Sequence, residues 1–157
     1  MNCLPKVVVI LVSLQLLGCA TQYQPMNIWS VGYSETQLGE NIYKVSFQGN
    51  DPSEKVRIED FTLLRCAELA LEKGASWFII IGSGYSENVS SYTAPVTTTT
   101  ITSPSGYPVT TTSGGQTYIS ATPTSSNTIV LLKDKPAGFS YEAAFVVKSI
   151  KEKYKIK

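Results

Sequence analysis

Residues 51–81 read DPSEKVRIEDFTLLRCAELALEKGASWFIII, and they carry the clearest structural signals of the chain. It begins like a helix, because Asp51 can cap the first turn, Pro52 suits the first helical position and Glu54 follows three places after the cap. Gly74 supplies the residue that commonly ends a helix. The stretch therefore predicts one long helix followed directly by an apolar segment.

The predicted helix is amphipathic. A helical wheel separates an apolar side, with Val56, Leu63, Cys66, Ala67, Ala70 and Leu71, from a charged side, with Glu54, Arg57, Arg65, Glu68 and Glu72. Arg65 and Glu68 lie one turn apart, so we expect an ion pair at the surface or edge. Cys66 falls among apolar neighbours, which favours inert core packing over a reactive thiol or an intermolecular bridge.

Strands are predicted on both sides of this helix. The run Trp77–Ile81 is continuously apolar and β-prone, which predicts a central strand buried on both faces. Two earlier candidates, 28–33 and 42–47, are separated by turn residues at 38–41 and predict a hairpin. The helix then joins 42–47 to 77–81 as a β-α-β unit, with these two strands parallel.

The end of the chain predicts a last strand at Ile129–Lys133 and a final helix that begins at Ser140. The apolar stripe of this helix contains Ala143, Val147, Ile150 and Tyr154, and its basic residues are Lys148, Lys151, Lys153, Lys155 and Lys157. Two interpretations of the lysines remain open. They complement the helix dipole, or they contact anionic lipid head groups.

These segments predict the fold class α+β. We expect one small mixed sheet of about four strands packed against two helices, in the order strand, strand, helix, strand, long loop, strand, helix. The domain would consist of residues 28–87 and 129–157.

The intervening segment has an unusual composition. From Asn88 to Leu132 there is no charged residue, and Thr and Ser dominate. Residues 88–128 are therefore predicted to be an insertion that is disordered or a floppy β-arm, with a well-packed meander as the alternative. Such an arm could bind a partner, or it could be a tolerated surface insertion.

The N-terminus resembles an export signal. Lys6 precedes an apolar run at Val7–Leu17 that is too short for a hydrocarbon core of about 30 Å. The end of the run, LLGC at 16–19, resembles the bacterial lipoprotein signal, which implies a signal peptide at 1–18 and a lipid on Cys19. Cleavage before Thr21, giving a soluble protein, and an uncleaved anchor are the alternatives.

A lipid anchor on Cys19 would attach the protein to a membrane permanently. Residues 19–27 are predicted to be a polar tether between this anchor and the domain. Ala20 resembles the residue that permits sorting to the outer membrane, so we expect an outer-membrane protein that faces the periplasm.

Composition narrows the possible chemistry. The chain has 13 basic and 12 acidic residues and no histidine. Charge therefore gives no indication of nucleic-acid binding, and catalytic pairs and metal sites that need imidazole are excluded. Once Cys3 is removed and Cys19 is acylated, Cys66 has no disulfide partner within the chain. We expect no catalytic, cofactor or metal site.

The tetrapeptide Gly-Tyr-Ser-Glu occurs at 32–35 and again at 84–87. If both copies close neighbouring strands, they would bring four residues together at one sheet edge: Tyr33, Tyr85, Glu35 and Glu87. This suggests a paired-carboxylate site, although turn chemistry or chance explains the repetition equally simply.

Several motifs together resemble a group of small proteobacterial envelope lipoproteins of unknown function. They are GYSE at 32–35, YKVSFQGN at 43–50, and Asp60 with LLRCAELALEKG at 63–74 and Phe78. The resemblance implies a location and domain boundaries, but no site. We expect a lipid-anchored envelope protein with a binding or scaffolding role and an envelope protein as partner. The alternative is a histidine-independent enzyme that acts on cell-wall or glycan material.

Overall fold

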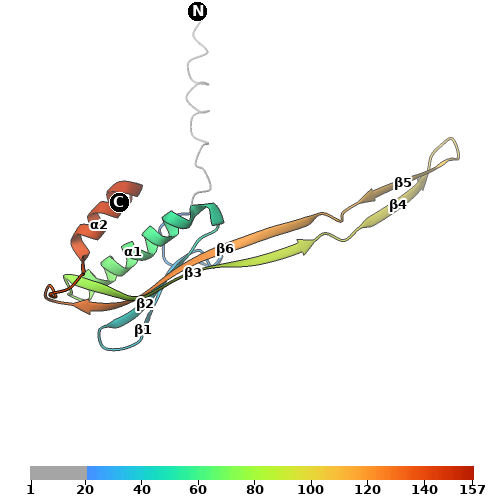
Figure 1. Ribbon diagram of the computed structural model, residues 1–157. Helices are drawn as coiled ribbons and strands as arrows, with labels where there is room; N and C mark the ends of the chain where they lie inside the picture. Colours follow the sequence, from blue (N-terminus) through green and yellow to red (C-terminus); the bar gives the residue numbers. More distant parts are fainter. Residues whose placement is uncertain (1–20) are drawn as a thin grey trace, which may run out of the picture.

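Strand pairing divides the protein into a five-stranded sheet and a two-stranded ribbon. The computed structural model describes residues 21–157 (Figure 1). The elements in chain order are β1 (Gly32–Gln37), β2 (Ile42–Gln48), the 3-10 turn η1 (Pro52–Glu54), α1 (Lys55–Glu72), β3 (Trp77–Thr93), β4 (Thr97–Thr102), β5 (Pro108–Ser113), β6 (Thr117–Leu132), β7 (Tyr141–Glu142) and α2 (Ala143–Tyr154). The predicted α+β class, with one sheet and two helices, is confirmed.

The larger sheet has the order β1-β2-β6-β3-β7, and every neighbouring pair is antiparallel. Because β2 and β3 both run antiparallel to β6, they are parallel to each other, as the β-α-β pattern predicted. The prediction that Trp77–Ile81 forms the central strand is wrong. The centre belongs to β6, which returns from the arm between β2 and β3.

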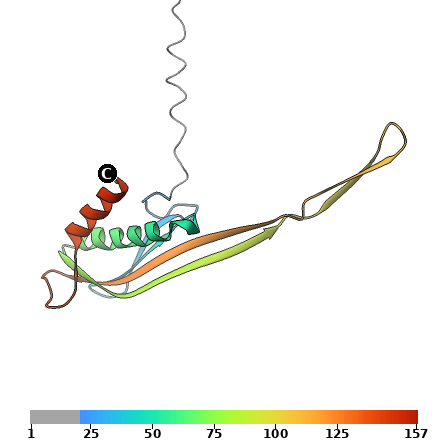
Figure 2. The same ribbon diagram turned by 45° about the horizontal axis from the view of Figure 1, so that its top comes forward.

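Both helices lie on one side of the sheet, with α1 against β2 and β6 and α2 against α1 (Figure 2). The prediction that Trp77–Ile81 is buried on both faces is also wrong, since Phe78 is fully buried but Ile81 is 57% exposed. An antiparallel sheet can leave one face to solvent, whereas the continuous apolar run had suggested a parallel one.

Local sequence signals mark both ends of the helical segment. Asp51 acts as a cap as predicted, because its Oδ1 accepts a hydrogen bond of 2.8 Å from the Ser53 backbone N–H. The turn that it caps is η1, however, and α1 begins only at Lys55. At the other end Gly74 has a φ of +75°, and the Ala75 N–H donates to the Ala70 carbonyl over 2.8 Å. This is the Schellman arrangement, for which glycine is the preferred residue.

The buried arc of α1 differs from the predicted one. Val56 is 62% exposed and Leu71 is 43% exposed, whereas Arg65 is only 7% exposed. The helix contacts the sheet on one side and α2 on another, so a wider arc is buried than a helical wheel with one apolar side allows. The largest fully buried side chains are Phe47, Phe78, Ile58, Leu64, Ile129 and Val45.

The first hairpin is shifted along the chain. Its turn is where the sequence predicted it, with the Leu38 N–H donating to the Ile42 carbonyl over 2.8 Å. The first strand, however, is Gly32–Gln37 and not 28–33. Ile28 is 91% exposed because Asn27 opens a turn there, accepting a hydrogen bond from the Trp29 N–H with its side chain.

The C-terminal part closely follows the predicted order. The strand predicted at 129–133 is the end of the much longer β6. The final helix starts at Ala143 and not at Ser140, because β7 first pairs with β3 through Phe78 and Tyr141. Its buried residues are Ala143, Val146 and Ile150.

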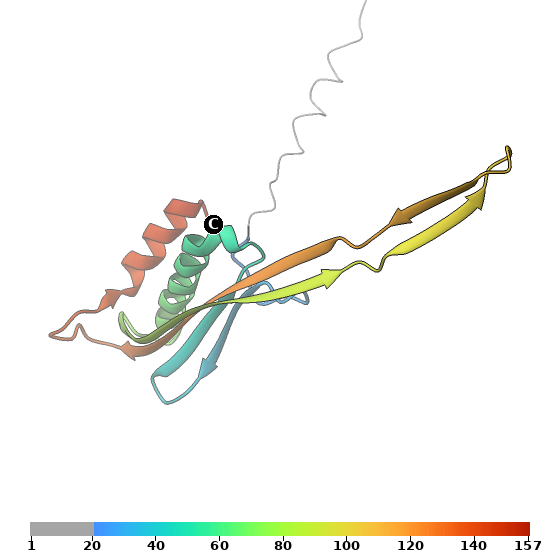
Figure 3. The ribbon, with the colours of Figure 1, turned by 45° about the vertical axis from the view of Figure 1, so that its right-hand side comes forward.

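Residues 88–122, which we call the arm, form a long β-ribbon that projects from the domain (Figure 3). The predicted insertion, 88–128, extended too far, because residues 124–128 pair with β2 in the sheet and Pro123 is fully buried. Its first part consists of the outer halves of β3 and β6, and its second part of β4 and β5. Gly114 lies where the two parts meet, with a φ of +98° and so little room that a Cβ would lie 2.0 Å from the Pro95 carbonyl oxygen. The arm is thus an ordered pair of strands, without the tight packing of a meander.

Candidate functional site

The structure docks the N-terminal segment onto the domain. The lipidation candidate Cys19 lies outside the described residues, which begin at Thr21. Thr21 is 3% exposed, its backbone N–H donates to Glu54 over 3.0 Å and its hydroxyl bonds with Asn50. Residues 21–27, predicted to be part of a tether, therefore pack against the core.

Aromatic side chains hold this segment. The Tyr23 ring is stacked on Phe47 with centroids 6.2 Å apart, and it meets the edge of Phe61 at 5.5 Å. Phe61 also packs against Tyr154 of α2, at 5.0 Å. These contacts form an aromatic cluster that connects the N-terminal segment, the sheet and both helices.

A glycine makes the close approach of the N-terminal segment possible. Gly32 has a φ of +127°, and a Cβ there would lie 2.5 Å from the Gln24 carbonyl oxygen. The Tyr33 N–H donates to that same carbonyl over 2.9 Å. An L side chain at position 32 would strain the backbone and push the segment away.

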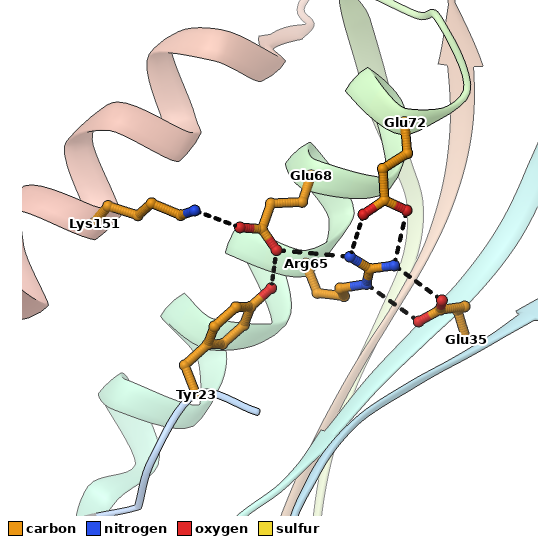
Figure 4. Close-up of polar contacts among 6 residues, drawn as sticks. All are labelled: Tyr23, Glu35, Arg65, Glu68, Glu72 and Lys151. Atoms are coloured by element: carbon orange, nitrogen blue, oxygen red, sulfur yellow. Dashed lines mark hydrogen bonds and ion pairs between the residues drawn. The ribbon is translucent and has the colours of Figure 1, made fainter. Parts of the chain in front are cut away.

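Beside the aromatic cluster, Arg65 is the centre of a charged cluster (Figure 4). Its guanidinium donates to both carboxylate oxygens of Glu35, over 3.2 and 3.0 Å, and to both of Glu72, over 2.6 and 3.0 Å. Its face lies 4.7 Å from the Tyr33 ring centroid. Such fork-to-fork pairs are the strongest geometry that Arg can make with carboxylates.

Glu68 extends the charged cluster to two other elements. One of its oxygens pairs with Lys151 of α2 over 2.8 Å, and the other accepts a hydrogen bond from the Tyr23 hydroxyl. The predicted pair between Arg65 and Glu68 is present at 3.6 Å, but it is longer than the Arg65 contacts with Glu35 and Glu72. Arg65 is buried, whereas the prediction placed the pair at the surface or edge.

The titration of the charged cluster suits a structural role. Burial by itself would lower the pKa of Arg65, but the hydrogen bonds that it donates to Glu35 and Glu72 raise this pKa above its ordinary value. Burial, followed by the hydrogen bond to Glu68, raises the pKa of the Tyr23 hydroxyl above its usual range. Arg65 therefore stays charged and Tyr23 stays neutral at physiological pH, which fixes the contacts.

Alkaline pH should weaken this arrangement. Tyr in an unfolded chain ionises near pH ~10, while the raised pKa keeps Tyr23 protonated in the folded chain, so the free energy of unfolding should fall above that pH. Tyr23→Phe should be less stable by about 1.5–3 kcal/mol near pH 7. The difference in the free energy of unfolding between this variant and the wild type should become smaller above pH ~10. Urea titrations from pH 7 to 11 measure both effects, and a constant deficit would contradict the assignment.

The repeated tetrapeptide does not form a paired-carboxylate site. Glu35 lies in the charged cluster, whereas Glu87 lies in β3 and accepts a 2.8 Å hydrogen bond from the Tyr85 hydroxyl. Two strands, β2 and β6, separate β1 from β3, so the copies are about 14 Å apart across the sheet at ~4.8 Å per strand. The hypothesis that Glu35 and Glu87 act together is wrong.

A hollow of about 370 Å³ lies between α1 and the sheet. Its lining residues include Glu59, Asp60, Ser125, Asn127 and Tyr141. Asp60 already accepts a 2.6 Å contact from Lys153 and a 2.7 Å hydrogen bond from Tyr154. These contacts join α1 to α2, and neither Glu35 nor Glu87, the predicted carboxylate pair, lines the hollow.

The position of Cys66 agrees with the predicted core packing. The residue is fully buried, and burial raises the pKa of its thiol to about 12. The native protein at pH 8 should therefore react with Ellman's reagent only on unfolding, because the thiolate is the reacting form. A fast reaction of the folded protein would show that Cys66 is accessible.

Two of the C-terminal lysines form ion pairs with α1. Lys151 and Lys153 pair with Glu68 and Asp60, and so they join α2 to α1. Lys155 takes a left-handed conformation with a φ of +55° where the helix ends. Contact of the remaining lysines with lipid head groups stays a prediction.

The arm offers a different kind of surface. Its outer part, β4 and β5, is exposed at every residue, and its exposed apolar side chains include Val89, Tyr92, Ile101, Tyr107, Tyr118 and Ile119. Backbone pairing holds the ribbon together, and threonine side chains add contacts across it. The hydroxyl oxygens of Thr100 and Thr110, for example, are 2.9 Å apart. It adds nothing to the core and leaves its strand edges open.

Comparison with known proteins assigns neither a family nor a function to the chain. No family model, curated protein or solved structure matches the chain. Within residues 21–157, no helix is long and apolar enough to cross a membrane. In the same part of the chain, no three acidic or cysteine side chains are grouped so that they could hold a metal ion.

Proposed function

We propose that the protein is a lipid-anchored lipoprotein of the bacterial envelope that acts by binding or scaffolding. Cys19 would carry the lipid, the outer membrane would be its location with the domain in the periplasm, and the arm would be the binding element. The observation that carries this proposal is the arm itself, an uncharged ribbon exposed over all of β4 and β5. An envelope protein is the kind of partner we expect.

The dimensions of the arm support a scaffolding role. From Asn88 to its tip near Ser105 the ribbon is extended, and at about 3.3 Å per residue it reaches roughly 55 Å from the domain. A loop without function could be much shorter. The reach allows contact with a partner that the domain itself does not touch.

The docked N-terminal segment supports a fixed position at the membrane. Thr21 is buried and bonded to Asn50 and Glu54. Cys19 precedes it by two positions, which span at most about 7 Å of extended chain. A lipid on Cys19 would therefore hold the domain close to the bilayer, and the arm would project from a fixed base.

Mass spectrometry of the mature N-terminus, combined with membrane fractionation, tests the anchor. We expect an acylated Cys19 peptide in the membrane fraction, and we expect Cys19→Ala to lose both the lipid and the membrane association. Ser13→Ala, within the signal segment but away from the cysteine, is the matched control. A soluble protein that begins at Thr21 would contradict the proposal.

A further inference from the structure

The outer ribbon has one edge that is open to another strand. β4 (Thr97–Thr102) contains no charge, proline or glycine, whereas β5 begins with Pro108, which has no backbone N–H to donate. An isolated two-stranded ribbon is only marginally stable, and an exposed edge without charges is a template for pairing. The β4 edge is therefore the better pairing surface of the two.

The hydrogen bonds at the tip show which backbone groups of β4 are free to pair. The Ser103 N–H donates across the ribbon to the Tyr107 carbonyl over 2.8 Å. Because inward and outward groups alternate along an antiparallel strand, Thr99 and Ile101 also point inward. Thr98, Thr100 and Thr102 then point their N–H and C=O groups outward.

Side-chain distances agree with this alternation. Residues opposite each other without backbone hydrogen bonds have closer side chains, and the Thr100 and Thr110 hydroxyl oxygens are 2.9 Å apart. Pro108 falls opposite Thr102 at a position of the same kind. Its missing N–H would point out of the ribbon, so the β5 edge lacks a donor.

We propose that the β4 edge pairs antiparallel with β4 of a second copy of this chain, around a two-fold axis at Thr100. This inference rests on the proposed role of the arm as the binding element. Thr100 would face Thr100 of the partner subunit, and Thr98 would face the partner's Thr102. Every outward N–H and C=O of these three residues then finds a partner, and the two ribbons become one four-stranded sheet.

The lack of charged residues in the arm favours a second copy of the chain as the strand that pairs with β4. A charged strand at this edge would place its charges against threonines, and the arm has no charge to pair with them. The identical β4 strand brings no charge, and it places Thr99 opposite the partner's Ile101. A two-fold contact of this kind closes on itself and does not extend into fibres. Membrane anchoring would also raise the effective concentration of one arm near another.

A cysteine at the two-fold axis tests the proposed register. Hydrogen-bonded antiparallel pairs have Cα atoms about 5.5 Å apart, which lies within the range of a disulfide. The full acylated chain with Thr100→Cys, treated in membranes with copper phenanthroline as the oxidant, should form a covalent dimer. Thr110→Cys, at the same height on β5, should stay monomeric. Equal dimer from both variants, or none from Thr100→Cys, would overturn the proposal.

A mixture of two cysteine variants gives a second test of the register. Thr98→Cys and Thr102→Cys should each crosslink poorly alone, whereas a co-expressed mixture should give at least several times more dimer, because 98 faces 102 across the axis. A crosslink from Thr100→Cys to a different protein, without chain dimer, would overturn the second copy as occupant.

A charge variant gives a test without thiols. Thr100→Lys places two like charges directly opposite each other, so the dimer seen by analytical ultracentrifugation should weaken at least tenfold, while Thr110→Lys should leave it unchanged. The lipid on Cys19 is measured by mass spectrometry on the same samples. A monomeric wild type with lipid would overturn the pairing alone, whereas a dimer without lipid would overturn only the proposed anchor.

Discussion

Arg65→Ala should lower the free energy of unfolding by about 2–4 kcal/mol, because it removes a buried guanidinium and leaves its partly exposed carboxylate partners without their cation. Arg65 is 7% exposed and makes four hydrogen bonds, two to Glu35 and two to Glu72. Removing it also uncovers the Tyr33 ring that its guanidinium now covers. Urea unfolding followed by circular dichroism measures the loss.

Two control variants separate charge from geometry. Arg57→Ala removes a cation of the same helix whose ion pair with Glu54 is partly exposed, so we expect a loss of about 1 kcal/mol or less. Arg65→Lys keeps the charge but cannot form two fork-to-fork pairs, and its loss should lie between those of the two alanine variants. Equal losses for Arg57→Ala and Arg65→Ala would show that burial of the charged cluster adds nothing.

The charged cluster also shows which contacts could be predicted from the sequence and which could not. Spacing along the helix predicted the Arg65 contact with Glu68, since residues three apart lie on one face. The stronger partner Glu35 is 30 residues away on β1. Only the pairing of β1 with β2, and of β2 with α1, brings Glu35 to the helix, and no local pattern encodes that distance.

Local signals were the reliable ones. Asp51 and Gly74 set the ends of the helical segment because caps act on their own backbone neighbourhood. The order of the strands, in contrast, depends on segments that are far apart in the sequence. β6 enters between β2 and β3 because the arm reverses direction far from the core, so the apolar run Trp77–Ile81 could not reveal that its neighbour comes from 117–132.

The N-terminal segment illustrates the same limit. Residues 19–27 are polar and contain Pro25, which indicates a tether when the segment is considered alone. In the structure Tyr23 enters a slot lined by aromatic rings, and Gly32 provides the space for the backbone at 24 and 25. A single tyrosine was the only local sign of this docking, and one aromatic residue does not define a pattern.

Phe61→Ala should destabilise the protein by about 3–5 kcal/mol, through lost burial and a cavity at the junction of three elements. Phe61 is 3% exposed and makes edge contacts with Tyr23, Phe47 and Tyr154. The loss should be measured by urea unfolding. Phe145→Ala, at an α2 residue that is 68% exposed, should change stability by less than about 0.5 kcal/mol.

The same variant should also release the N-terminal segment, because Phe61 supplies one wall of the slot for Tyr23. Limited proteolysis under native conditions should then cut within residues 21–27 faster in Phe61→Ala than in the wild type. Tyr23→Ala separates this local effect from global unfolding, since it removes the side chain that docks and leaves α1, the sheet and α2 in contact. If Tyr23→Ala accelerates cleavage while costing less stability than Phe61→Ala, docking of the segment is a local equilibrium on an intact domain. If neither variant changes the cleavage rate, the contacts of Thr21 with Asn50 and Glu54 are sufficient to hold the segment, and the aromatic cluster serves the core alone.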